Sequence, residues 1–378
     1  MRKSIAFLLV LVFLIASCII SVKPVWAPSA DSWASKAPMP TARFSFGVAV
    51  VNGNIYAIGG AVATQSGELT AVNEEYDPTA NMWTEKAPMP TPRYGCAVTA
   101  YENKIYVFGG GINGSYTSIT EVYDPATNTW VTKASMPTAR ILLQANVVDG
   151  KIYLIGGYDN RTFNEVYDPA TDSWITKAPI PTGVVAYASA VVDNKIYVIG
   201  GLTNLTQIYD PKTDKWSSGA PIPTPVSGAG VGAITGAAAP KAIYVVGGET
   251  DLFSPQNLTQ VYFPENNSWS LGASLPIVRS RLCGAVVNDR LYAIGGTRAV
   301  IHQGLTDNEQ YTPFGYGTIL PSPLPSPSQS PTTSPNQTQV STQEMLYGTT
   351  VAIVVVVIVA VVFSLRKRHK GKSYPSNG

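Results

Sequence analysis

The chain has 378 residues and nearly balanced charge, with 26 lysine or arginine, 24 aspartate or glutamate and two histidine residues. His302 and His369 are too few to build a copper or zinc site from several histidine ligands, so we expect no metal and no cofactor. Residues 28–345 hold 18 basic and 24 acidic residues, and this mildly acidic balance without a basic stripe argues against a nucleic-acid partner.

Residues 1–27 predict a secretory signal peptide. A basic N-terminus precedes an apolar run over residues 5–15, and Ala27 offers a small residue for cleavage. The run is shorter than the ~20 residues that span a bilayer, which disfavours the alternative of an N-terminal membrane anchor. A third interpretation is a relaxed lipoprotein box that ends at Cys18.

One sequence pattern fills almost the whole segment from residue 28 to 315. It reads K-A-P-M-P-T-A-R, an alternating apolar run, a turn, a strand-like run closed by Gly-Gly, then Tyr-Asp-Pro and Trp. The Gly-Gly pair occurs six times at intervals of 44 to 50 residues, a period typical of β-propeller blades. The six pairs begin at Gly59, Gly109, Gly156, Gly200, Gly247 and Gly295.

Each copy contains four strand-like runs and no sustained helical period. In the first copy these runs, called a to d from here on, cover residues 43–51, 54–59, 69–76 and 82–86. A four-stranded sheet cannot bury both faces alone, so neighbouring copies must stack on it. Six copies stacked in a closed ring predict an all-β, six-bladed β-propeller.

The repeat resembles the kelch motif. A hydrophobic strand that ends in Gly-Gly, a later Tyr and a Trp shortly after that Tyr carry the resemblance over roughly residues 30–315. The resemblance implies a propeller in which strand a lines the central channel and strand d is outermost. It is more specific for fold than for function, because kelch-like propellers include protein-binding modules, a copper oxidase and sugar isomerases.

The ends of the array predict how the ring closes. Trp33 precedes the first a-strand, whereas Tyr311 in the last copy has no Trp after it. We expect the segment from Asp31 to Lys36 to supply the missing d-strand of the sixth blade. That pairing would remove the exposed sheet edges of an open array.

An Arg near the start of strand a and a Glu two residues before the Tyr of strand c vary together among the copies. Blade four has Gly183 in place of the Arg and Gln207 in place of the Glu, and blade five has no Arg and has Gln260. This covariation predicts an ion pair within each of the other four blades, which makes these arginines structural rather than ligand-binding. The predicted pairs are Arg43 with Glu74, Arg93 with Glu121, Arg140 with Glu165, and Arg279 with Glu309.

The chain beyond the repeats divides into three predicted segments. Residues 316–345 are rich in Pro, Ser and Thr and predict an extended stalk. Residues 346–365 are apolar and at ~1.5 Å each match the ~30 Å core of a bilayer, which predicts one transmembrane helix. The basic tail, residues 366–378, is normally held in the cytoplasm. We therefore predict a single-pass protein of the cell membrane with its propeller outside.

Six Asn-x-Ser/Thr sequons are candidate N-glycosylation sites of an exported chain. They lie at Asn113, Asn160, Asn204, Asn257, Asn266 and Asn336.

Two cysteines lie within the repeats, Cys96 in blade two and Cys283 in blade six. These blades are not neighbours in a ring of six, so we expect no disulfide between them. We interpret both as small buried hydrophobic residues.

The b-to-c loops differ in length and sequence while the strands around them repeat, and variable loops on a rigid scaffold are where recognition usually resides. We therefore expect a non-catalytic, surface-tethered module that binds an extracellular protein or glycan through the face formed by the b–c and d–a connections. The candidate residues on this face are Glu68, Tyr116, Arg161, Glu249, Asp251, Arg298 and His302.

Two alternatives stay open. The first is an acid–base site resembling that of kelch sugar mutarotases, built from Glu249, Asp251, Arg298 and His302 in the loops after the b-strands of blades five and six. The second is a structural role in the cell envelope.

Overall fold

The computed structural model describes residues 30–62, 68–201, 203–251, 254–298 and 303–317. The predicted signal peptide, transmembrane helix and tail, and all but the first two residues of the predicted stalk, lie outside this part of the chain. Within it, no helix has the length and apolar character needed to cross a membrane. The regular structure of the described residues consists of β-strands.

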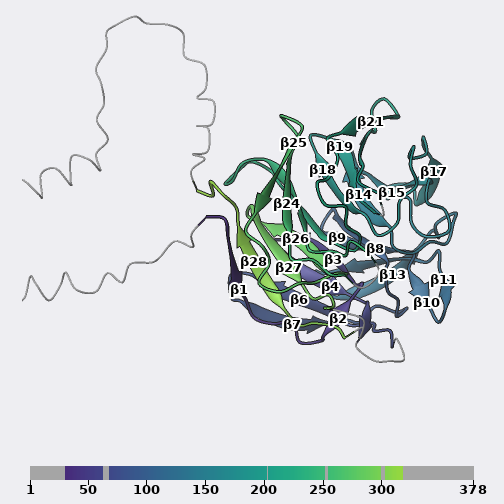
Figure 1. Cartoon of the computed structure of the whole chain (residues 1–378). Coiled ribbons are helices and arrows are strands. Elements are labelled where there is room, and N and C mark those ends of the chain that lie inside the picture. The colour runs from purple at the N-terminus through teal and green to yellow at the C-terminus, as the bar shows by residue number, and fades with distance from the viewer. Residues whose placement is uncertain (1–29, 63–67, 202, 252–253, 299–302, 318–378) are drawn as a thin grey trace, which may run out of the picture. The chain divides into compact units, whose positions relative to one another are not determined.

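Six four-stranded antiparallel sheets make up the fold (Figure 1). In each sheet the strands run in the order a, b, c, d, joined by backbone hydrogen bonds between neighbours. From a to d, blade one consists of β3 (Gly47–Val51), β4 (Asn54–Ile58), β6 (Asn73–Asp77) and β7 (Met82–Lys86), and blade two of β8 (Ala97–Tyr101), β9 (Lys104–Phe108), β12 (Thr120–Asp124) and β13 (Thr129–Lys133). Blade three consists of β14 (Gln144–Val148), β15 (Lys151–Ile155), β16 (Asn164–Asp168) and β17 (Ser173–Thr176), and blade four of β18 (Ala188–Val192), β19 (Lys195–Ile199), β20 (Thr206–Asp210) and β21 (Lys215–Gly219). Blade five consists of β22 (Gly230–Ile234), β23 (Ala242–Val246), β24 (Thr259–Phe263) and β25 (Ser268–Gly272), and blade six of β26 (Cys283–Val287), β27 (Arg290–Ile294), β28 (Asn308–Thr312) and β1 (Ser32–Ser35).

The a-strands contact one another in a closed circle, from β3 through β8, β14, β18, β22 and β26 back to β3. Six apolar clusters lie between neighbouring blades, and each combines side chains from two of them. The cluster between blades six and one, for example, packs Tyr292 and Ile294 against Ile55 and Tyr76. The predicted six-bladed propeller is therefore confirmed.

The a-strands are shorter than the sequence pattern predicts. In blade one the ladder starts at Gly47 because Ser45 adopts a left-handed conformation with φ of 51°. The preceding residues form a separate strand, β2 (Arg43–Phe44), which pairs with β5 (Ala61–Val62). A second short hairpin joins β10 (Gly111–Ile112) to β11 (Ser115–Tyr116).

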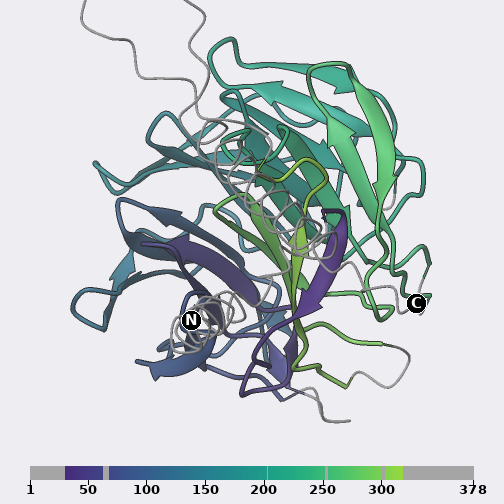
Figure 2. The same ribbon diagram turned by 90° about the vertical axis from the view of Figure 1, so that its left-hand side faces the viewer.

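The N-terminal strand closes the ring as expected. β1 pairs antiparallel with β28, with Trp33 opposite Tyr311, and both views show the two strands side by side (Figures 1 and 2). The Trp33 indole donates a hydrogen bond of 2.8 Å to the carbonyl of Ala273 in blade five. Blade six thus gains its d-strand from a segment more than 270 residues away in the sequence.

A repeated polar contact fastens each blade to the one before it. In every blade the hydroxyl of the strand-c Tyr donates a hydrogen bond to an Asn or Asp in the turn before strand d. The Oδ1 atom of that Asn or Asp also accepts a hydrogen bond from the backbone N–H of an Ala in the preceding blade, at 2.6–2.9 Å. These residues have φ of 51–59°, a left-handed conformation that Asn and Asp tolerate best among residues with a side chain. They are Asn81, Asn128, Asp172, Asp214, Asn267 and, from the N-terminal segment, Asp31.

The described chain ends on the side of the ring where the a–b turns lie. Tyr316 donates its hydroxyl hydrogen bond to the carbonyl of Asn288 at 3.1 Å, and Arg290 lies over its ring with Cζ 4.6 Å from the centroid. The N–H of Gly317 donates to Ala238 at 2.7 Å. The b–c and d–a connections lie at the opposite side, because successive strands are antiparallel.

Removal of the N-terminal strand should destabilise the entire ring. A chain that starts at Pro40 loses β1, the Trp33 hydrogen bond and both contacts of Asp31, and it leaves β28 as an exposed edge. We expect a lower melting temperature by calorimetry than for a chain that starts at Pro28. Equal melting temperatures for the two chains would contradict closure by β1.

Two of these turn residues, Asp172 and Asp214, should make stability depend on pH, because the pKa of each carboxyl is lowered in the fold. The hydrogen bond from Tyr209 is the main cause that lowers the pKa of Asp214 below its ordinary value. A carboxyl with a lowered pKa in the folded state adds stability above its unfolded pKa of about 3.9, and this stability is lost as the pH falls through the folded pKa. Between pH 7 and pH 3, the melting temperature of Asp214→Asn should therefore fall less than that of the wild type, with a difference of about one to three degrees.

The repeats supply a reciprocal control for this experiment. Asn128 holds the equivalent place in blade two, so Asn128→Asp should gain the pH dependence that Asp214→Asn loses. If both variants followed the wild-type pH profile, the turn carboxylates would not contribute to acid destabilisation.

Candidate functional site

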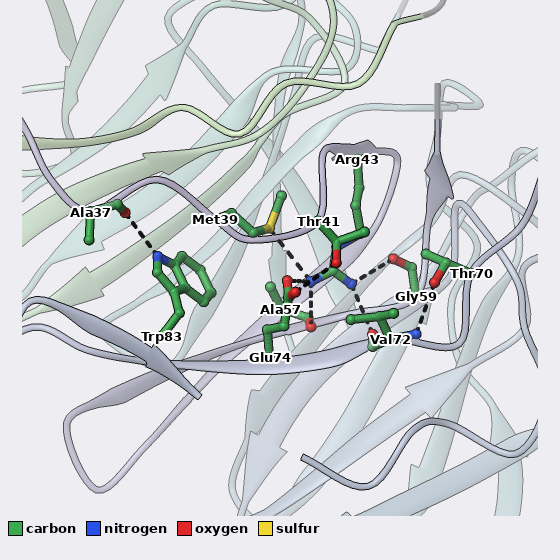
Figure 3. A network of polar contacts seen from close by, with 10 residues as sticks. All are labelled: Ala37, Met39, Thr41, Arg43, Ala57, Gly59, Thr70, Val72, Glu74 and Trp83. Carbon is green, nitrogen blue, oxygen red and sulfur yellow. Dashed lines mark hydrogen bonds and ion pairs between the residues drawn. The ribbon is translucent and has the colours of Figure 1, made fainter. Parts of the chain in front are cut away.

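The four predicted Arg–Glu pairs are all present, and they are buried inside their blades. Arg43 meets Glu74 at 2.6 Å between Nη2 and Oε2, and its guanidinium also donates to the carbonyls of Ala57, Gly59 and Val72 at 2.8–3.1 Å (Figure 3). The side chains of all four arginines are 0% exposed. The other pairs are Arg93 with Glu121 at 3.1 Å, Arg140 with Glu165 at 2.6 Å, and Arg279 with Glu309.

Burial is the dominant influence on these charges. It lowers the pKa of Arg43, Arg140 and Arg279, and the neighbouring glutamates oppose that effect. A guanidinium without a partner at this depth would be very costly, which explains why each one is surrounded by a carboxylate and backbone carbonyls. No solvent-borne ligand can reach these arginines, so the recognition chemistry must come from other residues.

In the two blades without an Arg, a neutral Gln occupies the position of the Glu and bonds to the backbone instead. The Gln207 side-chain amide accepts the N–H of Thr182 at 2.9 Å and donates to its carbonyl at 3.0 Å. Gln260 makes the same pair of bonds with Thr224, both at 2.9 Å. A neutral amide that satisfies its own donor and acceptor needs no counter-ion.

The residue that replaces the Arg in blade four is Val184, not Gly183 as the sequence comparison indicated. The N–H of Gly157 donates to the Val184 carbonyl at 3.0 Å, just as that of Gly110 donates to Arg140 at 2.9 Å. A side chain at Gly183 would collide with the neighbouring loop, because a Cβ there would lie 2.7 Å from the Cβ of Arg161.

A closed ring of six backbone hydrogen bonds lies at the d–a side of the a-strands. One residue per blade donates its N–H to the carbonyl of the equivalent residue in the preceding blade, at 2.6–3.0 Å, and the residue of blade one donates to that of blade six, which closes the circle. All six residues have φ between 51° and 61°. They are Ser45, Gly95, Leu142, Ala186, Gly228 and Arg281.

Four of these ring residues carry a side chain despite the left-handed conformation, which costs roughly 1–2 kcal/mol per residue. The ring hydrogen bonds offset that cost. They also place the side chains of Ser45, Leu142, Ala186 and Arg281 around one centre. Arg281 is the one charged member of the ring, and sequence comparison missed it because the six positions share a backbone conformation and no residue type.

Arg281 and Glu249 form a half-buried polar pair beside this ring. Arg281 Nη2 lies 3.5 Å from Glu249 Oε1, and the two side chains are 27% and 12% exposed. Ser280 donates its hydroxyl hydrogen bond to the other carboxylate oxygen at 3.3 Å. Glu249 comes from the b–c loop of blade five, whereas Ser280 and Arg281 come from the d–a connection of blade six. The pair therefore spans two blades.

The remaining charged candidates are not gathered around Glu249. Arg298 lies 3.9 Å from Asp307 in its own b–c loop, beside a hollow of ≈ 490 Å³ that Ala42 also lines. Asp251 is exposed in the loop of blade five, and His302 lies outside the described residues. The acid–base site expected from Glu249, Asp251, Arg298 and His302 is thus not brought together by the described contacts.

A second cluster on the same face is aromatic and joins blades two and three. Tyr116 and Tyr158 have ring centroids 5.8 Å apart at an interplanar angle of 72°, and Arg161 Cζ lies 5.7 Å from the Tyr158 centroid. Phe163 lies in the same loop as Arg161 and is exposed. Tyr116 and Arg161 were predicted, whereas Tyr158 was missed.

The other predicted residues are scattered. Glu68 is exposed in the b–c loop of blade one, where its carbonyl accepts the N–H of Val62 at 2.9 Å. Among the sequons, Asn113, Asn204 and Asn266 are exposed, Asn160 and Asn257 are half-buried, and Asn336 lies outside the described residues.

The cysteines and acidic residues offer no metal site in the described part of the chain, which holds no group of three or more His, Cys, Asp or Glu side chains suited to an ion. Cys96 is buried as expected. Cys283 is half-buried, and its thiol donates to the carbonyl of Phe46 at 3.0 Å.

Comparison with known families decides the identity of the fold. A family model described as Kelch motif matches residues 42–90, and one described as FKB95, Kelch-repeats domain, matches residues 85–220. The chain is a kelch-repeat β-propeller. Of the solved structures similar to this kelch propeller, one titled Structure of YjhT has a TM-score of 0.61 and 20% identity, and the match covers 73% of this chain and 96% of that one. At this identity the likeness establishes the fold alone.

Curated relatives match only a small part of the kelch propeller. Kelch-like protein 28 from Homo sapiens is 37% identical over 68 residues, which is 18% of this chain and 12% of that protein. Kelch repeat protein M-T8 from Myxoma virus (strain Lausanne) is 35% identical over 65 residues, which is 17% of this chain and 13% of that protein. A kelch propeller suggests a protein-interaction module, and the partners and activities of these longer proteins belong to them.

The contrast between charged and neutral blades yields a double-mutant test. Arg93→Val should destabilise the protein by about 3–5 kcal/mol, because it leaves the buried Glu121 carboxylate without its counter-ion. Adding Glu121→Gln should recover more than half of that loss, since blade five combines Val226 with Gln260 behind the same Thr-Pro sequence. Denaturant unfolding of the two single variants and the double variant measures the coupling, and additive losses would mean that the residues do not interact.

Proposed function

We propose that this kelch propeller is a non-catalytic binding module that contacts an extracellular protein or glycan through the face formed by its b–c and d–a connections. The observation that carries the proposal is the separation of the arginines into two sets. The four that repeat are buried in ion pairs, whereas Arg161, Arg281 and Arg298 lie in the connections of this one face, where Arg161 and Arg298 are exposed and Arg281 is half-buried. Three guanidinium groups that solvent can reach thus lie on this face.

Two unlike surfaces on this face favour selective recognition. Blades two and three present the aromatic cluster of Tyr116 and Tyr158, whereas blades five and six present the Glu249–Arg281 pair. A partner that contacts both would be held in a single orientation, since neither surface can replace the other.

We also propose that the propeller is tethered to the cell membrane by residues 346–365, with the binding face turned away from it. The support is the apolar run itself and the end of the described chain on the a–b side, opposite the binding face. Protease treatment of intact cells should release a soluble propeller fragment and leave the tail protected. Recovery of the whole chain in the soluble fraction would contradict the tether.

The binding proposal predicts saturable binding without turnover. The purified protein should bind a member of a secreted-protein or glycan array, and Glu249→Gln together with Arg281→Ala should weaken binding about tenfold or more, because a half-buried ion pair is removed. Leu271→Ala on the outer strand β25, which is 66% exposed, is the control and should leave binding unchanged. Sugar anomerisation that is abolished by the same double variant would instead favour the enzyme alternative.

A further inference from the structure

The aromatic cluster of blades two and three has a geometry that its structural role does not explain. Tyr116, Tyr158 and Phe163 are 37%, 42% and 38% exposed, although the tyrosines that stabilise the blades, such as Tyr123 and Tyr167, are completely buried. Tyr116 comes from the β10–β11 hairpin and Tyr158 from the b–c loop of the next blade. Two neighbouring blades therefore each contribute an outward-facing ring to one place, which is called the aromatic corner below.

The backbone holds the aromatic corner in position. Tyr158 donates its N–H to the carbonyl of Ile141 at 2.8 Å, and the carbonyl of Arg161 accepts the N–H of Val184 at 3.0 Å. The hairpin is fixed to blade two through Gly111, whose N–H donates to Tyr94 at 2.8 Å. Because these bonds are made before any ligand arrives, little ordering is left to oppose binding.

Missing side chains make room for the corner. A Cβ on Gly111 would lie 2.5 Å from the ring of Tyr94, and a Cβ on Gly183 would lie 2.7 Å from the Cβ of Arg161. Only glycine at these two positions lets the hairpin and the Arg161 loop approach their neighbours so closely.

The size of the corner distinguishes between classes of ligand. An aromatic side chain presents about 150–250 Å² in total, so the two rings of Tyr116 and Tyr158, exposed by about two fifths, offer roughly 120–200 Å². A stable protein partner normally covers about 800 Å² on each side. One or two sugar rings need far less area, and their hydroxyl groups need polar neighbours, which the phenol groups and the Arg161 guanidinium supply.

We propose that the aromatic corner binds a saccharide. The C–H face of a pyranose ring packs on the negative face of a tyrosine ring, while Arg161 donates hydrogen bonds to hydroxyl or carboxylate oxygens at its edge. This inference rests on the proposed binding face and narrows its ligand in blades two and three to carbohydrate. It requires no chemistry from the Glu249–Arg281 pair.

Saturation-transfer difference NMR on the full chain, produced in a bacterial host that adds no N-glycans, tests the proposal. The probes are three trisaccharides, one composed of glucose, one of N-acetylglucosamine and one of galacturonate. We expect saturation of ring C–H protons in at least one of them and an affinity about fivefold lower in Tyr158→Ala and Tyr116→Ala, whereas Tyr158→Phe should keep most of it. Arg161→Ala should weaken the galacturonate probe most, because that probe carries carboxylates.

Phe314→Ala supplies the matched control, since Phe314 is an exposed aromatic residue, 76% accessible, near the end of the described chain and away from the corner. Its binding should equal that of the wild type. Saturation of none of the probes, or binding that Tyr158→Ala does not change, would overturn the saccharide proposal. Loss of saccharide binding only in the Glu249→Gln/Arg281→Ala variant would also overturn the saccharide proposal, and so would a protein partner whose binding depends on Tyr158. Either result would leave the proposal of a binding module standing.

Discussion

Each blade of this propeller buries its two faces only against its neighbours, so the fold is stable only if the circle of six interfaces closes. Closure depends on non-local contacts, chief among them the pairing of β1 with β28. Asp31 and Trp33 bring to blade six the same turn residue and the same indole hydrogen bond that the other blades obtain locally. The chain must bring its two ends together before the last interface forms, and the resulting loss of entropy is compensated by six interfaces that form together.

Within that circle, the buried polar side chain of strand c is satisfied in one of two ways. The carboxylate of Glu74 is held by a buried guanidinium, whereas Gln207 fills the equivalent place by bonding the backbone of Thr182. The neutral version folds as well as the charged one in the same molecule, so a buried charge is not needed to build a blade. This agrees with the general finding that a buried ion pair is strongly destabilising to break but contributes little net stability.

The sequence was sufficient for the repeating features that a residue type marks. The absence of a Trp after Tyr311 predicted the closing strand, and the joint change of Arg and Glu to other residues predicted the ion pairs. Positions that only the backbone geometry identifies were missed or misplaced. The register of blade four was misplaced by one residue, at Gly183, because only a hydrogen bond from the neighbouring blade identifies Val184 as the equivalent position.

The candidate site was only partly predictable for the same physical reason. Tyr158 acquires its significance from Tyr116 in another blade, and Arg281 from a left-handed backbone that no residue type marks. Sequence comparison within the repeats finds what the blades have in common. A binding surface on such a scaffold consists of what they do not share.

The ring of six hydrogen bonds has a consequence for how specificity can change. Because each N–H and carbonyl of the ring is already bonded to its neighbour, the backbone there offers few free groups to a ligand, and recognition falls to the side chains of Ser45, Leu142, Ala186 and Arg281. Replacing any of them alters the chemistry at the centre of the face without altering the frame that supports it. A single substitution at one of these positions therefore changes the side chains that a ligand would meet at the centre of the face.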